Sequence, residues 1–278
     1  MAENYSSTPL LETRSVSKSF GAVQALTKVD FEVFPGEVIA LVGDNGAGKS
    51  TLIKGIAGIY GFDEGEVKFE GRHVTIHSPR EAAGLGIEVV YQDLALADNL
   101  DVVANMFLGR EWNAGIPPTT GAAPNVNGFL KYLRNLLPVT EIEMEKRAVS
   151  TLNELAVTTL RSVRLPVAAL SGGQRQSVAI AKAVLWNSKV VILDEPTAAL
   201  GVAQTRQVLN LVRRLADRNL GVVIISHNLH DIFEVADRIC VLRLGHKVKT
   251  FKREETDQKE VVHAITAGQL GTVPGMAS

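Results

Sequence analysis

The feature that most constrains this 278-residue chain is a glycine-rich segment between a compact apolar run and a helical pattern. Residues 43–50 read Gly-Asp-Asn-Gly-Ala-Gly-Lys-Ser, which fits G-x-x-x-x-G-K-[S/T], and Val-Ile-Ala-Leu-Val precedes them at 38–42. Apolar residues then recur with helical spacing over 50–58. A strand, a glycine-rich loop and a helix in this order predict a phosphate-binding loop for a nucleotide triphosphate.

The residue types in this phosphate loop explain the prediction. Glycines let successive backbone N–H groups face phosphate oxygens, and the helix N-terminus adds the positive end of its dipole. Lys49 is expected to reach the β- and γ-phosphates, and Ser50 to offer its hydroxyl to Mg²⁺. A chance glycine-rich turn is the alternative, and the strand–loop–helix context argues against it. The candidate nucleotide-binding residues here are Gly43, Asp44, Asn45, Gly46, Ala47, Gly48, Lys49, Ser50 and Thr51.

A second apolar run, Val-Val-Ile-Leu at 190–193, ends in two acids, Asp194 and Glu195. Ligands of α/β folds bind at the carboxyl ends of strands, so both acids are expected beside the phosphate loop. Asp194 suits Mg²⁺ binding through water. Glu195 suits polarisation of an attacking water, which is typically worth about 10²–10⁴-fold in rate. Two acids at a strand end can also be merely solvated, and the phosphate loop favours function.

The remaining patterns predict an α/β fold: a P-loop NTPase (RecA-like) core with an N-terminal antiparallel β-subdomain and an inserted helical subdomain. Two short alternating strands are expected between residue 14 and the turn at 34–37. Core strands are expected at 39–42, 190–193 and 222–225, and a surface loop at 112–128. We expect one domain over 9–251, with the core at 9–95 and 166–251, the helical subdomain at 96–165, and a C-terminal helix and mobile tail at 252–278.

Composition limits the partners and the compartment. The formal net charge of −1 provides no global positive field, so no nucleic-acid partner is expected. Cys240 is the only cysteine, which excludes an internal disulfide and predicts a small core residue. The N-terminus lacks the pattern of a secretory signal. The longest apolar runs fall far below the roughly 20 residues of a membrane span, so any membrane role is expected from outside the bilayer.

Residues 170–174 read Leu-Ser-Gly-Gly-Gln, the LSGGQ segment, and a helical run follows them. A serine and two glycines at a helix start form a second phosphate cradle. One phosphate loop leaves this second cradle without a phosphate. Two copies facing each other head to tail would resolve this, because each would supply Ser171 and Gly173 to the ATP held by the other copy's Lys49.

The motifs, taken in order, resemble those of the ABC ATPase family over about residues 11–250. The segment from Lys49 to Ser171 spans 122 positions, and that from Ser171 to Asp194 spans 23, as in the family. The elements that carry the resemblance are Phe20, the phosphate loop, Gln92 in Val-Tyr-Gln-Asp, LSGGQ, Val-Val-Ile-Leu-Asp-Glu, and His227 after Val-Val-Ile-Ile-Ser.

The resemblance implies roles that spacing alone would not give. Phe20 would stack on adenine, and Gln92 would bind Mg²⁺ or the attacking water and transmit the nucleotide state to the helical subdomain. His227 would contact the γ-phosphate, so the implied catalytic set is Glu195, His227 and Gln92. Ordinary packing, a polar loop residue and a helix cap are the respective alternatives. The implied cradle for the second copy's ATP is Ser171, Gly172, Gly173 and Gln174.

Longer stretches, including GDNGAGKSTLIKGIAG and ISHNLHDIFEVADRICVLRLGHKV, resemble the monosaccharide-importer branch of the family. This implies an ATP-sandwich homodimer, peripheral on the cytoplasmic face of the membrane. Its expected partners are membrane permease subunits and, indirectly, an extracytoplasmic sugar-binding protein. Gly201 stands where the family usually has Asp, so we expect the dimer contact there to use backbone groups.

The sequence is also compatible in part with other functions of P-loop proteins. Non-transport ABC ATPases insert long coiled coils, whereas 145 positions separate Lys49 from Asp194 here and show no heptads. An exporter cassette stays open as an alternative. A regulatory module that hydrolyses little is disfavoured by the intact Glu195, and a small-molecule P-loop kinase leaves LSGGQ unexplained.

Overall fold

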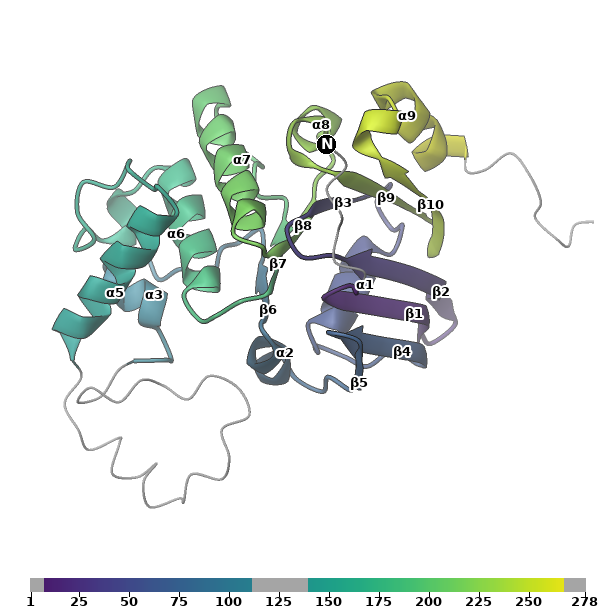
Figure 1. Ribbon diagram of the computed structural model, residues 1–278, viewed down its shortest axis with the longest axis horizontal. Helices are drawn as coiled ribbons and strands as arrows, with labels where there is room; N and C mark the ends of the chain where they lie inside the picture. Colours follow the sequence, from purple (N-terminus) through teal and green to yellow (C-terminus); the bar gives the residue numbers. More distant parts are fainter. Residues whose placement is uncertain (1–7, 112–139, 268–278) are drawn as a thin grey trace, which may run out of the picture.

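The computed structural model describes residues 8–111 and 140–267, which form two sheets with helices around them (Figure 1). The predicted surface loop at 112–128 and the predicted tail from 268 onward lie outside the described residues. The predicted C-terminal helix is present as α9 (Gln258–Ala267), which packs against the larger sheet near β9.

The larger sheet has six strands, and all of them run parallel except the edge strand β10. Its three central strands are apolar except for Asp194 at the end of one of them, because helices or the second sheet cover both faces. This confirms the predicted parallel core. The strand order is β10 (His246–Lys252), β9 (Arg238–Arg243), β3 (Val38–Val42), β8 (Gly221–Ile225), β7 (Val190–Asp194) and β6 (Ile87–Val90).

The register of the central strands brings the site segments together. Ile225 at the end of β8 pairs with Leu41 on one side and with Asp194 on the other. Three neighbouring strands therefore end at one level. The segments that follow β3, β7 and β8 must emerge side by side at the carboxyl edge of the sheet.

The smaller sheet is the predicted N-terminal antiparallel β-subdomain. Its strands β1 and β2 are longer than the two short segments expected from the sequence, and register shifts bend β1 along its length. Helix α1 (Lys49–Ile56) lies between the two sheets, where Leu52, Ile53 and Ile56 are buried. The strand order is β2 (Val23–Val33), β1 (Leu11–Phe20), β4 (Glu64–Phe69) and β5 (Arg72–Val74).

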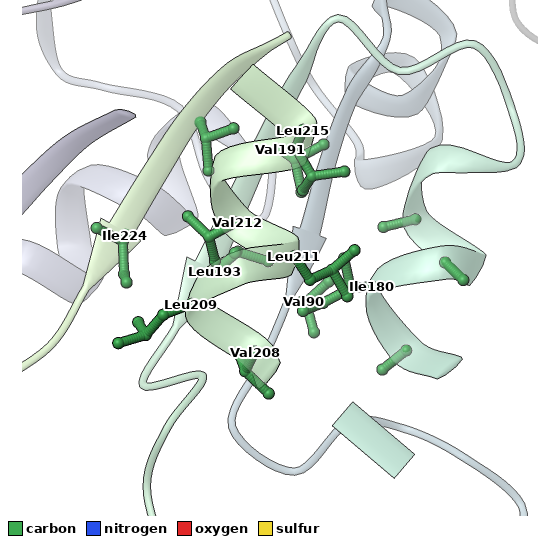
Figure 2. Close-up of a cluster of buried hydrophobic side chains, with 14 of the residues drawn as sticks. Val90, Ile180, Val191, Leu193, Val208, Leu209, Leu211, Val212, Leu215 and Ile224 are labelled. Atoms are coloured by element: carbon green, nitrogen blue, oxygen red, sulfur yellow. The ribbon is translucent and has the colours of Figure 1, made fainter. Parts of the chain in front are cut away.

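The other face of the large sheet is covered by α7 (Val202–Asp217) and α6 (Gly172–Val184). Figure 2 shows Leu211 and Leu215 of α7 among side chains of the sheet, with Ile180 of α6 beside Val90. Helices α3 (Val102–Phe107) and α5 (Glu141–Glu154) pack with α6 at the left of Figure 1.

Short elements complete the described fold. The α-helices are α2 (Pro79–Leu85) and α8 (Leu229–Val235), and the 3₁₀ turns are η1 (Val167–Ala169) and η2 (Arg253–Glu255). Within residues 8–111 and 140–267, no helix is long and apolar enough to cross a bilayer.

Candidate nucleotide-binding site

The phosphate loop is built so closely onto the core that two of its positions accept only glycine. Gly43 has φ +150°, and a Cβ there would collide with the carbonyl oxygen of Leu242 in β9. Gly48 has φ +102°, and its Cβ would lie 2.7 Å from Cδ2 of Leu26. The sequence pattern G-x-x-x-x-G therefore reflects both backbone conformation and the close approach of β9 and β2.

Lys49 points back into the phosphate loop. Its ammonium donates hydrogen bonds to the carbonyl oxygens of Gly43, at 2.6 Å, and Asp44, at 3.0 Å. Burial lowers the pKa of Lys49, and the nearby carboxylates of Glu195, Asp44 and Asp194 oppose that shift. The loop after β3 and the acids after β7 thus meet around one ammonium, as the sequence predicted.

Asp194 and Glu195 interact as a like-charged pair. Burial raises the pKa of Asp194, and the neighbouring charge of Glu195 raises it further, while Lys49 and Lys54 act in the opposite direction. Glu195 adopts φ +50°, and its N–H donates to the carbonyl oxygen of Ile225 at 2.9 Å. A non-glycine residue in this region is strained, and such strain is concentrated at functional sites.

His227 lies against Glu195. Its Nδ1 is 2.9 Å from Oε2 of Glu195, and its side chain is 81% exposed, whereas that of Glu195 is only 18% exposed. The alternative that His227 caps the next helix does not hold, because Asn228 is the N-cap of α8 and accepts the N–H of His230. His227 therefore does not cap α8, and its imidazole faces the carboxylate of Glu195.

Phe20 ends β1 with its side chain about half exposed. The ring of Tyr60 meets it edge to face, with centroids 5.2 Å apart, and Oη of Tyr60 donates to the carbonyl oxygen of Thr51 in α1. The ammonium of Lys18 lies 5.6 Å from the Phe20 ring and is held by Asp63. Sequence reasoning missed Tyr60, which ties the candidate adenine platform to the helix of the phosphate loop.

Gln92 is exposed in the turn that follows the edge strand β6. The turn continues through Leu94 and Ala95, both of which have positive φ. Beside it opens a groove of about 300 Å³, lined by residues that include Tyr91, Lys182 and Trp186. In this groove Arg110 lies 3.0 Å from Glu88, whose pKa is raised by burial.

The LSGGQ segment forms the start of α6. Ser171 is the N-cap, and its N–H donates to the side chain of Gln174 in a capping box. The amide of Gln174 also donates to the carbonyl oxygen of Thr159 at 2.7 Å. Figure 1 shows α6 on the opposite side of α7 from α1, so α7 separates the helix that this segment starts from the helix of the phosphate loop.

The contacts of the two cradle glycines involve the segment that follows the acids. A Cβ on Gly172 would lie 3.0 Å from Leu200, and one on Gly173 would lie 3.0 Å from the side chain of Gln204. Gly201 is the N-cap of α7, and a Cβ there would meet nothing within 4 Å.

The site offers a small set of donors to Mg²⁺. Among the residues that the structure describes, no group of three or more His, Cys, Asp or Glu side chains could form a metal cage. Mg²⁺ in nucleotide sites takes one or two carboxylates plus phosphate oxygens and waters. Asp194, close enough to Lys49 for their charges to interact, and Ser50 in the first turn of α1 fit that limited requirement.

The fold and this site define a P-loop enzyme that binds a nucleotide triphosphate at the carboxyl edge of a parallel sheet. A family model described as ABC transporter matches residues 26–198. The fructose import ATP-binding protein of Rhizobium meliloti is 44% identical over 94% of this chain and 95% of its own length. The xylose/arabinose import ATP-binding protein of Sulfolobus acidocaldarius is 44% identical over 95% and 96%.

Solved structures of ATP-binding cassettes are similar to this chain over most of its length. A nucleotide-free ATP-binding cassette from an ABC transporter superimposes with a TM-score of 0.73 at 30% identity, covering 91% of this chain and 95% of that one. A dimeric cassette bound to ADP and phosphate gives 0.67 at 25% identity over 87% and 98%. The chain belongs to the ABC transporter family, in which it is an ATP-binding cassette, an ATPase coupled to transport.

Proposed function

We propose that this chain powers a monosaccharide importer as its ATP-hydrolysing subunit, peripheral on the cytoplasmic face of the membrane. The observation that carries the proposal is the match along almost the whole chain to import ATP-binding proteins for fructose and for xylose/arabinose. The proposed unit is one ABC ATPase domain over 9–251, with its core at 9–95 and 166–251 and its helical subdomain at 96–165.

The phosphate loop and Phe20 are proposed to bind ATP. Lys49 would exchange its two carbonyl partners for phosphate oxygens, and Phe20 would stack on adenine. Ser50, Asp194 and Gln92 would hold Mg²⁺, which neutralises charge that develops on the phosphate oxygens.

Glu195 and His227 are proposed to catalyse ATP hydrolysis. Glu195 would polarise the attacking water, and His227 would contact the γ-phosphate while its Nδ1 stays near Oε2 of Glu195. Gln92 would complete the set from the turn after β6. The contacts of Glu195 support this proposal, because its carboxylate lies 2.9 Å from Nδ1 of His227 and close enough to Lys49 for their charges to interact.

A second copy of the chain is the proposed partner at the LSGGQ segment. The segment starts α6, which lies across α7 from α1, and its capping box orders the N-terminus of α6. In a head-to-tail pair, Ser171, Gly172, Gly173 and Gln174 would meet the ATP bound by the other copy. Gly201 would then contribute backbone groups at the interface.

Permease subunits are the proposed partners at the groove beside Gln92. The groove combines an exposed strained turn, the ring of Trp186 and the Glu88–Arg110 ion pair, so it offers both apolar and charged contacts to a short helix. Closure of the ATP-bound dimer would move this groove and the permease with it. A sugar-binding protein outside the membrane would deliver the substrate.

Uptake assays test the sugar assignment. A strain that lacks this gene is expected to lose accumulation of one radiolabelled monosaccharide among fructose, xylose and ribose. The wild-type chain should restore it, and Lys49→Ala, made to equal abundance, should not. Normal uptake of all monosaccharides in the deletion strain would overturn the assignment, and co-purification with a polytopic membrane protein would test the permease separately.

A further inference from the structure

A buried hydrogen bond connects the segment that carries Glu195 to the helix that follows His227. Oγ1 of Thr197 donates to Oδ2 of Asp231 at 2.7 Å. Both residues are buried, with 9% and 3% of their surfaces exposed, although 34 positions separate them in the sequence. A buried carboxylate is costly unless it is hydrogen-bonded, so this contact is a strong constraint on both segments.

The bond joins the same two chain segments as the Glu195–His227 contact. Thr197 comes two residues after Glu195, and Asp231 comes four residues after His227 and belongs to α8. The Glu195–His227 contact itself depends on a highly exposed imidazole, which water can compete for. The buried bond is protected from that competition and joins the same two segments.

The backbone around Thr197 also needs restraint. Glu195 and Ala199, on either side of it, both have positive φ, +50° and +59°. Such conformations persist only where the surrounding structure fixes them. Within this turn Thr197 anchors the middle, because its hydroxyl is fixed to α8 while the N–H of Glu195 is fixed to β8.

We propose that Thr197 and Asp231 are positioning residues for ATP hydrolysis. Their bond keeps the turn after β7 against α8, and so keeps Oε2 of Glu195 within reach of Nδ1 of His227. Both side chains are buried, so neither is proposed to touch the nucleotide. The inference rests on the proposed roles of Glu195 and His227 and adds to them the element that holds the two side chains together.

Thr197→Val removes the hydroxyl and keeps the shape of the side chain. The expected result is a kcat lowered roughly 10- to 100-fold, as for a small misplacement of a catalytic group, with KM for ATP within about twofold of wild type. Thr197→Ser and Asp231→Asn, which keep a donor and an acceptor respectively, should retain most of kcat. An unchanged kcat in Thr197→Val overturns the proposal.

A double variant distinguishes a loss of positioning from a loss of the fold. Thr197→Val combined with Asp231→Leu replaces both polar partners, so it leaves no unpaired buried carboxylate. It should unfold at about the wild-type temperature and still lose kcat. A folded double variant with wild-type kcat overturns the proposal.

The His227→Ala background separates positioning from a general structural role. If the bond acts through His227, Thr197→Val should cause little further loss of kcat in His227→Ala. An equal fractional loss in both backgrounds overturns this inference and leaves the proposed role of His227 intact. If His227→Ala alone kept wild-type kcat, the proposed role of His227 would fail as well.

Discussion

The ionised form of Asp194 is disfavoured in the folded chain. Burial raises the pKa of Asp194 most and the charge of Glu195 raises it further, and Lys49 and Lys54 offset these effects only in part, because the pKa remains above its ordinary value. At the scale of single residues, the site therefore contains groups that are suited to a ligand rather than to stability.

Asp194→Asn is expected to raise the thermal midpoint of the chain measured without nucleotide near neutral pH. The folded chain protonates Asp194 more readily than the unfolded chain, so the penalty is complete above the folded-state pKa. It disappears as the pH falls below the ordinary pKa of aspartate, and the gain should vanish there. Calorimetry over a pH series checks this.

The matched control is Asp98→Asn, which changes a carboxylate that is 70% exposed. A gain of equal size in both variants, or a gain for Asp194→Asn that persists in acid, would contradict the electrostatic explanation.

Phe20→Ala is expected to raise KM for ATP roughly 10-fold while kcat changes little, because stacking of a base on an aromatic ring is worth about 1–3 kcal/mol. Phe20→Tyr should behave like wild type. Tyr60→Phe keeps the edge-to-face ring but loses the bond to Thr51, so a smaller rise in KM is expected. An unchanged KM in Phe20→Ala would rule out the stacking role.

The site was predictable where its chemistry lies in consecutive residues. The phosphate loop at 43–50 and the acids at 194–195 are motifs of consecutive residues, so the sequence alone identifies them. Tyr60 and the pair Thr197–Asp231 were not predictable, because their contacts join side chains that only the folded chain brings together.

At the scale of secondary-structure elements, the helix caps show where the chain departs from its family. Ser171 gives α6 a complete capping box, whereas Gly201 gives α7 no side-chain acceptor. The departure predicted to affect the dimer thus also leaves the first turn of α7 without a side-chain acceptor from its N-cap residue.

Gly201→Asp is expected to stabilise the chain by about 0.3–1 kcal/mol, because it supplies an acceptor and a negative charge at the start of α7. The φ of −74° suits Asp, and there is space for its Cβ. Urea denaturation measures the change. Gly201→Ala adds a Cβ without an acceptor, and an equal gain in that control would contradict the capping explanation.

The lengths of the elements were predicted less well than their types. β1 and β2 are long strands where two short segments were expected, because register shifts allow β1 to bend and pair with both β2 and β4. The apolar runs that became β3, β7 and β8 were identified correctly because both faces of these strands are buried.

At the scale of the whole molecule, one apolar cluster joins the large sheet to the helical part. It continues from α7 through α6 to α3 and α5. This continuity is why the helical part is expected to respond to changes at the sheet edge.

Leu193→Ala is expected to destabilise the chain by about 2–5 kcal/mol, since it opens a cavity where Leu193 is fully buried. Chemical denaturation monitored by fluorescence and by circular dichroism checks the size of the effect. Val202→Ala is the control, because Val202 is 84% exposed and should change stability little. A loss below about 1 kcal/mol in Leu193→Ala would contradict the packing.

Glu195→Gln is expected to bind ATP, hydrolyse it slowly and accumulate as a dimer at saturating MgATP. Light scattering measures the mass, and Glu195→Gln combined with Lys49→Ala should remain monomeric under the same conditions. A monomeric Glu195→Gln chain with bound ATP would contradict the sandwich arrangement.

Leu41, Ile225 and Asp194 are paired across three neighbouring strands, and this alignment matters when related chains are compared. Neighbouring strands lie about 4.8 Å apart, and a slip of one residue turns every side chain of a strand to the opposite face. Deleting a single residue inside β8 would therefore displace His227 while leaving the phosphate loop, LSGGQ, the two acids and His227 itself in the sequence. A relative can retain all of the family's signature residues and still be inactive, so the spacing between strand and motif must be compared as carefully as the motifs themselves.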